Sequence, residues 1–170
     1  SLILWNYLKF SGVKNSMHEI NHLLPKIFII LIFIQIIIGA FVAGLDAGKM
    51  YNTWPLMGSS YFPDDNKFIN IFSLSAFSDP SLVQFMHRNL AYIIFLFYFY
   101  IVFIMYKKKL HSFYNIVNLI GILLFFQILL GILTLILGAQ ILISSMHQIS
   151  SIFLVSSSVY FFYLNFNQQP

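Results

Sequence analysis

Two histidines are the residues of this chain best suited to chemistry, because each stands at the head of a long apolar run. His87 lies in "MHRNLAYIIFL" and His147 lies in "MHQISSIFL". An imidazole binds protons and metals, and a polar group in hydrocarbon costs on the order of several kcal/mol unless it has a partner. A hydrogen bond to a neighbouring helix would explain either histidine alone. The repeated setting favours a ligand that the two histidines share.

The composition identifies the environment in which these histidines must be held. Hydrophobic residues make up 59% of the chain and charged residues 8%, whereas about a quarter of the residues in a soluble domain are charged. We therefore expect a membrane protein that contacts lipid. The chain has no cysteine, which excludes disulfides, thiolate metal sites and cysteine nucleophiles. It also lacks a basic stripe with interleaved aromatic residues, so we expect no nucleic-acid partner.

Four charge-poor segments are long enough to cross a bilayer. They are residues 27–45, 83–106, 113–137 and 142–164. The first would be roughly 28 Å long at about 1.5 Å per residue, close to the thickness of the hydrocarbon layer. Gly138, Ala139 and Gln140 are expected to form the turn between the last two spans. The predicted fold class is an all-α polytopic membrane protein, a four-helix transmembrane bundle made of two helical hairpins.

Two regions are expected within the chain. Residues 1–26 should hold the end of a truncated span, residues 1–8, followed by a loop on the inner side, because the chain begins at Ser1 inside an apolar run. Residues 27–170 should form the transmembrane bundle, with residues 46–82 as its outer loop.

The basic residues are divided unequally between the two sides of the membrane in this arrangement. One side receives Lys9, Lys14, Lys26 and Lys107 to Lys109, and the other receives Lys49, Lys67 and Arg88. Since basic residues concentrate on the inner side, the first side is expected to be cytoplasm or mitochondrial matrix. The predicted location is therefore the bacterial plasma membrane or the mitochondrial inner membrane.

An internal repeat relates the two hairpins. The first span contains "FIQIIIGAFVAG" and the third contains "FFQILLGILTLI", which aligns Gln35 with Gln127 and Gly39 with Gly131. The second and fourth spans share the methionine and histidine that precede their apolar runs. Each hairpin therefore runs outward, turns, and returns with a histidine near its start, so the two histidines should lie at similar depth.

Haem iron is the ligand that best suits such a pair. Its two axial positions face opposite ways and accept imidazoles from facing helices, so His87 and His147 are the predicted metal ligands. Gly39, Gly44 and Gly131 would allow the haem to approach closely, although small residues also serve ordinary helix packing. Arg88 lies at the water-facing end, where it would contact the haem propionates or anchor the helix at the interface.

A second motif, "HEINH", has the spacing of a helical zinc site. His18 and His22 would be ligands, with Glu19 as the catalytic carboxylate of a membrane zinc protease. Ser16 and Glu19 also form a capping box, and Pro25 interrupts the helix soon afterwards. The segment is therefore better interpreted as a short capped surface helix.

Three longer motifs resemble those of a known family. The stretch "GAFVAGLDAGKMYNTWPLMG" of residues 39–58, "VQFMHR" of residues 83–88, and "HQ" of residues 147–148 are similar, in order and spacing, to motifs of the haem A synthase family of mitochondria and bacteria. The resemblance implies eight spans in two four-helix halves, of which this chain matches the C-terminal half. It also implies that His87 and His147 are the axial ligands of a haem b cofactor.

The resemblance implies an activity as well. The family converts haem O to haem A by oxidising the C8 methyl group to a formyl group, with oxygen supplied by water, during assembly of cytochrome c oxidase. Its catalytic glutamate is expected in the missing N-terminal half, because the only glutamate here is Glu19, on the inner side. This chain would be the cofactor-haem half and inactive alone. Its expected partners are haem O, the missing half, and haem O synthase or other oxidase assembly factors.

An alternative function belongs to the class of electron carriers. Iron with both axial positions filled cannot bind oxygen without losing a ligand, so a haem held by His87 and His147 is suited to electron transfer. A stand-alone bis-histidine transmembrane cytochrome b would have the same ligands without the synthase activity.

Overall fold

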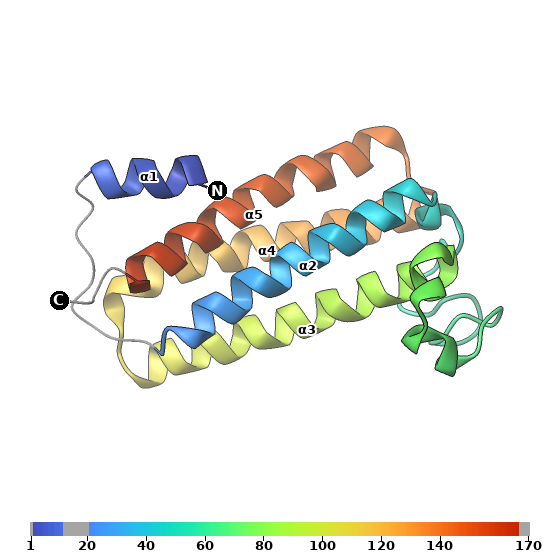
Figure 1. Cartoon of the computed structure of the whole chain (residues 1–170), viewed down its shortest axis with the longest axis horizontal. Helices are drawn as coiled ribbons and strands as arrows, with labels where there is room; N and C mark the ends of the chain where they lie inside the picture. Colours follow the sequence, from blue (N-terminus) through green and yellow to red (C-terminus); the bar gives the residue numbers. More distant parts are fainter. Residues whose placement is uncertain (1, 12–20, 167–170) are drawn as a thin grey trace.

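The protein is a bundle of four long helices that run side by side (Figure 1). The structure, a computed structural model, describes residues 2–11 and 21–166. The long helices are α2 (Leu23–Gly44), α3 (Pro80–Lys107), α4 (Tyr114–Ile136) and α5 (Ile141–Phe166), and a short helix, α1 (Leu2–Phe10), lies against α5. All four long helices are long and apolar enough to cross a membrane. The predicted fold class, an all-α multi-pass membrane bundle, is confirmed.

The ends of the helices follow from local sequence signals. Asp79 caps α3, because its Oδ1 atom accepts a hydrogen bond of 3.0 Å from the backbone N–H of Leu82, and Pro80 occupies the first helical turn. This cap explains why α3 begins before its apolar run. The turn between α4 and α5 falls at the predicted residues, since Gly138 and Ala139 have φ angles of 67° and 58° and so reverse the chain in the left-handed region.

The helices are arranged so that α3 and α5 occupy opposite corners of the bundle. Helix α2 packs against both α3 and α5, and α4 packs against the same two helices from the other side (Figure 1). The predicted hairpins are present as α2 with α3 and α4 with α5. The two histidine-bearing helices, α3 and α5, therefore face each other across the bundle.

The main cluster of buried apolar side chains within the bundle extends to its inner end, and a separate buried set that includes Met57, Leu82 and Val83 lies at the outer end. The large members of the main cluster include Phe28 near the start of α2, Met105 near the end of α3, Phe113 just before α4, and Phe161 near the end of α5. These positions lie toward the end where α3 finishes in its lysine run, which is the predicted inner side. The outer half of the bundle, where both histidines lie, depends on a different set of contacts.

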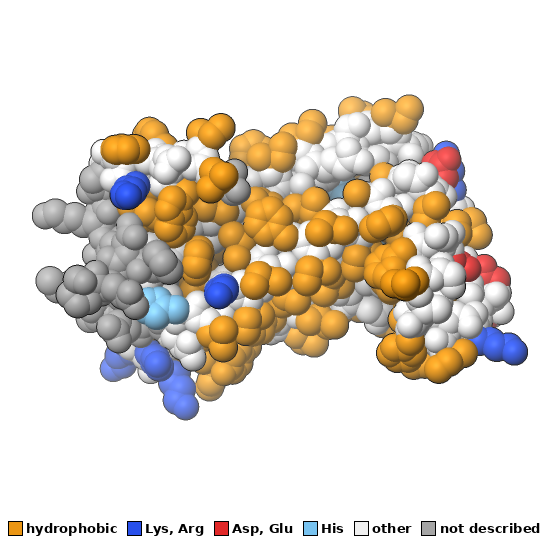
Figure 2. Space-filling model, viewed as in Figure 1, with side chains coloured by type: hydrophobic (Ala, Val, Ile, Leu, Met, Phe, Trp, Pro, Cys, Tyr) orange, Lys and Arg blue, Asp and Glu red, His pale blue; other side chains and the backbone are white. Residues whose placement is uncertain are grey.

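Charged groups gather at the two ends of the molecule, and apolar side chains cover its length (Figure 2). Leu96 and Phe103 of α3, for example, are 68% and 60% exposed. The acidic side chains coloured in this view lie at the end that carries the outer loop, whereas the charged side chains of the described residues seen at the opposite end are basic. This distribution is what a helical bundle surrounded by lipid requires.

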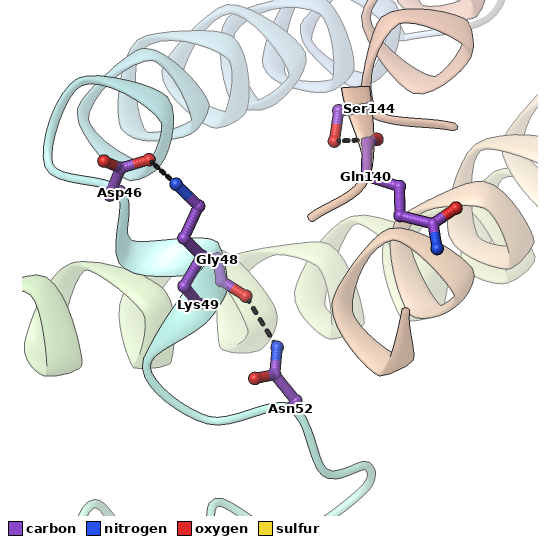
Figure 3. A network of polar contacts seen from close by, with 6 residues as sticks. All are labelled: Asp46, Gly48, Lys49, Asn52, Gln140 and Ser144. Carbon is purple, nitrogen blue, oxygen red and sulfur yellow. Dashed lines mark hydrogen bonds and ion pairs between the residues drawn. The ribbon is translucent and has the colours of Figure 1, made fainter. Parts of the chain in front are cut away.

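The outer loop between α2 and α3 is fastened to the second hairpin. It contains three short 3-10 helices: η1 (Ala47–Lys49), η2 (Phe68–Phe72) and η3 (Leu74–Ser78). The side-chain amide of Asn52 donates to the carbonyl of Gly48 at 3.0 Å and to that of Leu135, in the last turn of α4, at 2.8 Å. Figure 3 shows Asn52 beneath η1, with the ion pair of Asp46 and Lys49, 2.8 Å long, beside it.

A close contact between α3 and α4 gives a test of the packing. The Tyr98 hydroxyl donates to the carbonyl of Val117 at 3.2 Å and fills the space that a Cβ at Gly121 would need. Gly121→Ala should displace Tyr98 and cost about 1–3 kcal/mol, as overpacking does. The melting temperature in detergent should fall, and Tyr98→Phe in the same chain should restore part of it. Equal melting temperatures for Gly121→Ala and the unsubstituted chain would contradict this packing.

Candidate functional site

The two histidines predicted from the sequence lie in the outer half of the bundle on opposite helices. His87 is near the start of α3 and His147 is near the start of α5. Both residues are half-buried. The internal repeat predicted that the two histidines lie at similar depth, and each does lie near the start of the returning helix of its hairpin.

His87 is held by two residues of α2. The side-chain amide nitrogen of Gln35 donates to the backbone carbonyl of His87 at 3.1 Å and lies 3.3 Å from the Nε2 atom of its ring. One turn further along α2, a Cβ atom at Gly39 would lie 3.2 Å from the Cε1 atom of the same ring. The imidazole therefore lies against bare backbone at Gly39, with the amide of Gln35 beside it.

His147 is held in the same way by two residues of α4. The amide nitrogen of Gln127 donates to the carbonyl of His147 at 2.9 Å and lies 3.2 Å from its Nδ1 atom. A Cβ atom at Gly131 would lie 3.1 Å from the Cε1 atom of this ring. The internal repeat is thus a repeat of one constellation, in which a glutamine and a glycine four residues apart hold a histidine of the following helix.

Sequence reasoning aligned these glutamines and glycines without assigning the glutamines to the histidines. For Gly39, Gly44 and Gly131 it left open haem approach or helix packing. The structure places an imidazole against Gly39 and Gly131, whereas a Cβ at Gly44 would meet nothing within 4 Å. The signal that could have shown this was the shared spacing of glutamine and glycine in the two spans, combined with the equivalent depth of the histidines.

The two constellations differ at one position. The hydroxyl of Ser150 donates to the Oε1 atom of Gln127 at 2.5 Å and also contacts the carbonyl of His147 at 3.0 Å. Leu90 stands at the equivalent place in the first repeat and has no polar side-chain atom. The Oε1 atom of Gln35 is consequently buried without a hydrogen-bond partner.

Buried polar atoms without partners gather around the histidines. Among the described residues these atoms are Gln35 Oε1, Gln84 Oε1, His87 Nδ1, Arg88 Nε and Thr134 Oγ1. All belong to the outer halves of α2, α3 and α4. Since buried polar groups are nearly always hydrogen-bonded, such a cluster indicates a place where a polar or metal-bearing ligand would complete the structure.

Arg88 directs its guanidinium group into the outer loop. Its Nη atoms donate to the backbone carbonyls of Tyr51, Thr53 and Leu56 at 2.8, 2.9 and 3.2 Å. No carboxylate pairs with it among the described residues. The contacts show that Arg88 orders the loop, a role that the sequence did not suggest, and its predicted contact with haem propionates stays a prediction.

Further hydrogen bonds fasten the loop over the start of α3. The carboxylate of Asp65 accepts from Tyr51 at 3.0 Å and from Ser81 at 2.6 Å. Desolvation disfavours the ionised form of Asp65, but these hydrogen bonds outweigh it and lower the pKa of the carboxyl. Burial and the nearby Asp65 raise the pKa of the Tyr51 hydroxyl.

The zinc motif is only partly described. His18 and Glu19 lie outside the described residues, as does Ser16 of the capping box. The Nδ1 atom of His22 lies 3.1 Å from the side-chain amide nitrogen of Asn165. Within residues 2–11 and 21–166, no group of three histidine, cysteine or acidic side chains is placed to hold a metal ion.

The fold and the paired histidines define a multi-pass membrane protein of the helical-bundle class with a repeated histidine site in its outer half. Residues 1–159 match the COX15-CtaA family, described as a cytochrome oxidase assembly protein. Because this match covers nearly the whole chain, the protein belongs to that family.

Several bacterial relatives named haem A synthase are similar to the chain. That of Pelagibacter ubique is 39% identical over 166 residues, covering 98% of this chain and 49% of the relative. That of Rickettsia prowazekii is 38% identical over 171 residues, covering 96% and 51%. The chain therefore spans about half the length of the curated relatives it matches. No solved structure matches it significantly.

The contacts of Arg88 predict how the loop responds to its loss. Arg88→Met removes three hydrogen bonds from a charged donor, each worth about 1.5–3 kcal/mol when buried and less here because the group is half-exposed. Even a loss of about 1.4 kcal/mol raises the open fraction of the loop roughly tenfold. Limited proteolysis should cut residues 45–79 correspondingly faster. Lys67→Met, at an exposed lysine of the same loop, should not do so, and equal rates for both variants would contradict the assignment.

The lowered pKa of Asp65 predicts a loop that loosens in acid. A carboxyl whose pKa is depressed by folding contributes stability that is present above its ordinary value of 3.8 and is lost as the pH falls through the lower folded value. Pepsin should therefore cleave the loop increasingly fast below about pH 3.8. Asp65→Asn should flatten this profile, and an unchanged profile in the variant would show that Asp65 is not responsible.

Proposed function

We propose that this chain is the cofactor-haem half of a haem A synthase, with His87 and His147 as the axial ligands of a haem b. The observation that carries the proposal is the repeated glutamine, glycine and histidine constellation on opposite sides of the bundle. The matched relatives, named haem A synthase, support the same function. In this proposal residues 27–170 form the haem-binding unit, and residues 1–26 precede it.

The residues present fit a haem. An apolar bundle suits the macrocycle, and two imidazoles on α3 and α5 suit the two axial positions of its iron. The Nδ1 atom of His87 is buried without a partner, and the Nε atom of Arg88 is in the same state. Arg88 also provides a positive charge without a carboxylate partner among the described residues, which suits the anionic propionates.

Each residue has a definite part in this function. His87 and His147 would hold the iron from both sides, which leaves no open position for oxygen. When bound, the haem supplies one-electron transfer. The outer loop, ordered by Arg88 and Asn52, would shield the haem edge from water. Leu96, Phe103 and the other exposed apolar side chains would keep the bundle in lipid.

The reaction proposed for the whole protein is oxidation of the C8 methyl group of haem O to the formyl group of haem A. Water supplies the oxygen, and the electrons removed from the methyl group must leave the substrate. With one water consumed, this oxidation releases four electrons and four protons. The haem-binding half would accept the electrons one at a time and pass each to an external one-electron acceptor, while the protons leave to water. The substrate haem and the catalytic glutamate would belong to the remainder of the protein, and haem O synthase and oxidase assembly factors are proposed partners.

The ligands can be tested by absorbance spectroscopy. The purified chain, reconstituted with haem b in detergent, should show a low-spin spectrum. His87→Ala and His147→Ala should each abolish it, because low-spin iron requires both imidazoles. His111→Ala, at an exposed histidine on the inner side, should leave it intact. If both His87→Ala and His147→Ala retain the native low-spin spectrum, the ligand assignment is wrong.

A second measurement separates the synthase from a simple electron carrier. The chain should be co-expressed with the other half of a haem A synthase from Pelagibacter ubique or Rickettsia prowazekii, and haem O and haem A should be measured in the membranes. Formation of haem A that requires His87 and His147 supports the synthase. A low-spin haem with no haem A formed in any combination would favour a stand-alone cytochrome b.

A further inference from the structure

The glutamines beside the two histidines have a geometry that ordinary helix packing does not require. One amide group contacts both the backbone carbonyl and the ring of the same histidine, in each repeat. A side chain that only joined two helices would need one of these contacts. Two contacts to one residue fix the position of its backbone and the orientation of its ring together.

We propose that Gln35 and Gln127 are positioning residues that set the ring planes of His87 and His147 for iron binding, with Gly39 and Gly131 as the surfaces against which the rings lie. This inference rests on the proposed haem ligation. It assigns to each ligand one helix that carries the histidine and another that orients it, α2 for His87 and α4 for His147.

The space around each ring supports this role. A Cβ at Gly39 or Gly131 would lie 3.2 or 3.1 Å from a ring carbon, which is closer than side chains ordinarily approach. The glycine and the glutamine amide therefore both limit rotation of the ring. Gly44 of α2 provides the contrast, since a Cβ there would meet nothing within 4 Å.

The chemistry of a ligated imidazole also calls for such a partner. When one ring nitrogen binds iron, the other carries a proton and requires an acceptor, and that acceptor raises the basicity of the ligand. In this structure the amide nitrogen of each glutamine, a donor, faces the ring, so its oxygen would have to turn toward the ring to accept that proton when iron is bound. In the first repeat both His87 Nδ1 and Gln35 Oε1 are buried without partners, a donor and an acceptor that complement each other.

In the second repeat the glutamine is predicted to be a weaker acceptor for its histidine, because Ser150 already donates to the Oε1 atom of Gln127. An oxygen that accepts from a hydroxyl is a weaker acceptor for a second donor. Gln35 should therefore influence the electron donation of its histidine more strongly than Gln127 does. The two axial ligands of one iron would then be unequal, although their ring positions are alike.

The test uses the purified 170-residue chain with haem b and two substitutions at each glutamine. Gln35→Leu and Gln127→Leu should weaken haem affinity about 10- to 100-fold, as loss of an outer partner of a metal ligand does. They should also change the low-spin electron paramagnetic resonance signal, which depends on the angle between the two imidazole planes. Gln140→Leu, at an exposed glutamine in the α4–α5 turn, should change neither.

Glutamate variants and glycine variants distinguish a positioning role from a loss of fold. Gln35→Glu should retain haem with a lowered midpoint potential, because a carboxylate is a stronger acceptor, and Gln127→Glu should lower it less. Gly39→Ala and Gly131→Ala should alter the resonance signal, whereas Gly44→Ala should not.

These measurements distinguish failure of the positioning role of the glutamines from failure of the proposed haem ligation. A native signal and an unchanged potential in every glutamine and glycine variant would overturn this inference while leaving the ligands in place. Absence of low-spin haem from the unsubstituted chain would overturn the proposed function, and this inference with it.

Discussion

The constraint on which this structure depends is the placement of a polar ring inside an apolar bundle. An imidazole surrounded by hydrocarbon must have hydrogen-bond partners, and lipid offers none. The chain meets part of this requirement with an amide of the neighbouring helix beside each ring and with a glycine that lets the ring lie against the backbone, and it leaves the Nδ1 atom of His87 without a partner. Both hairpins use the same solution, so the pairing of helices within each hairpin follows from the needs of its histidine.

The bundle has two halves with different sources of stability. At the inner end, large apolar side chains such as Phe28, Phe113 and Phe161 fill the core, and their packing holds the helices together. At the outer end, hydrogen bonds involving Gln35, Gln127 and the loop are added to the packing of buried side chains such as Leu82 and Val83. The inner half can therefore keep the helices in register while the outer half contains polar atoms that a ligand would satisfy.

Much of the fold was predictable from the sequence, because charge-free runs of suitable length are a direct signal of membrane spans. The turn at Gly138 and the two hairpins were also predictable, from turn residues and from the repeat. The loop contacts of Arg88 and Asn52 were not, since both join backbone atoms far apart in the chain and leave no periodic pattern. The contacts of Gln35 were predictable only in part. The repeat singled out the residue, but it did not show that its partner is His87.

The side chain of Asn52 has a mechanical consequence for the whole molecule. Its amide connects the carbonyl of Gly48, in η1 just after the outgoing helix of the first hairpin, with that of Leu135, in the last turn of the outgoing helix of the second. Sliding of one hairpin past the other along the membrane normal would break the hydrogen bond between Asn52 and Leu135. A single amide at the water boundary thus fixes the relative height of the two hairpins, and with it the relative depth of His87 and His147 in the membrane.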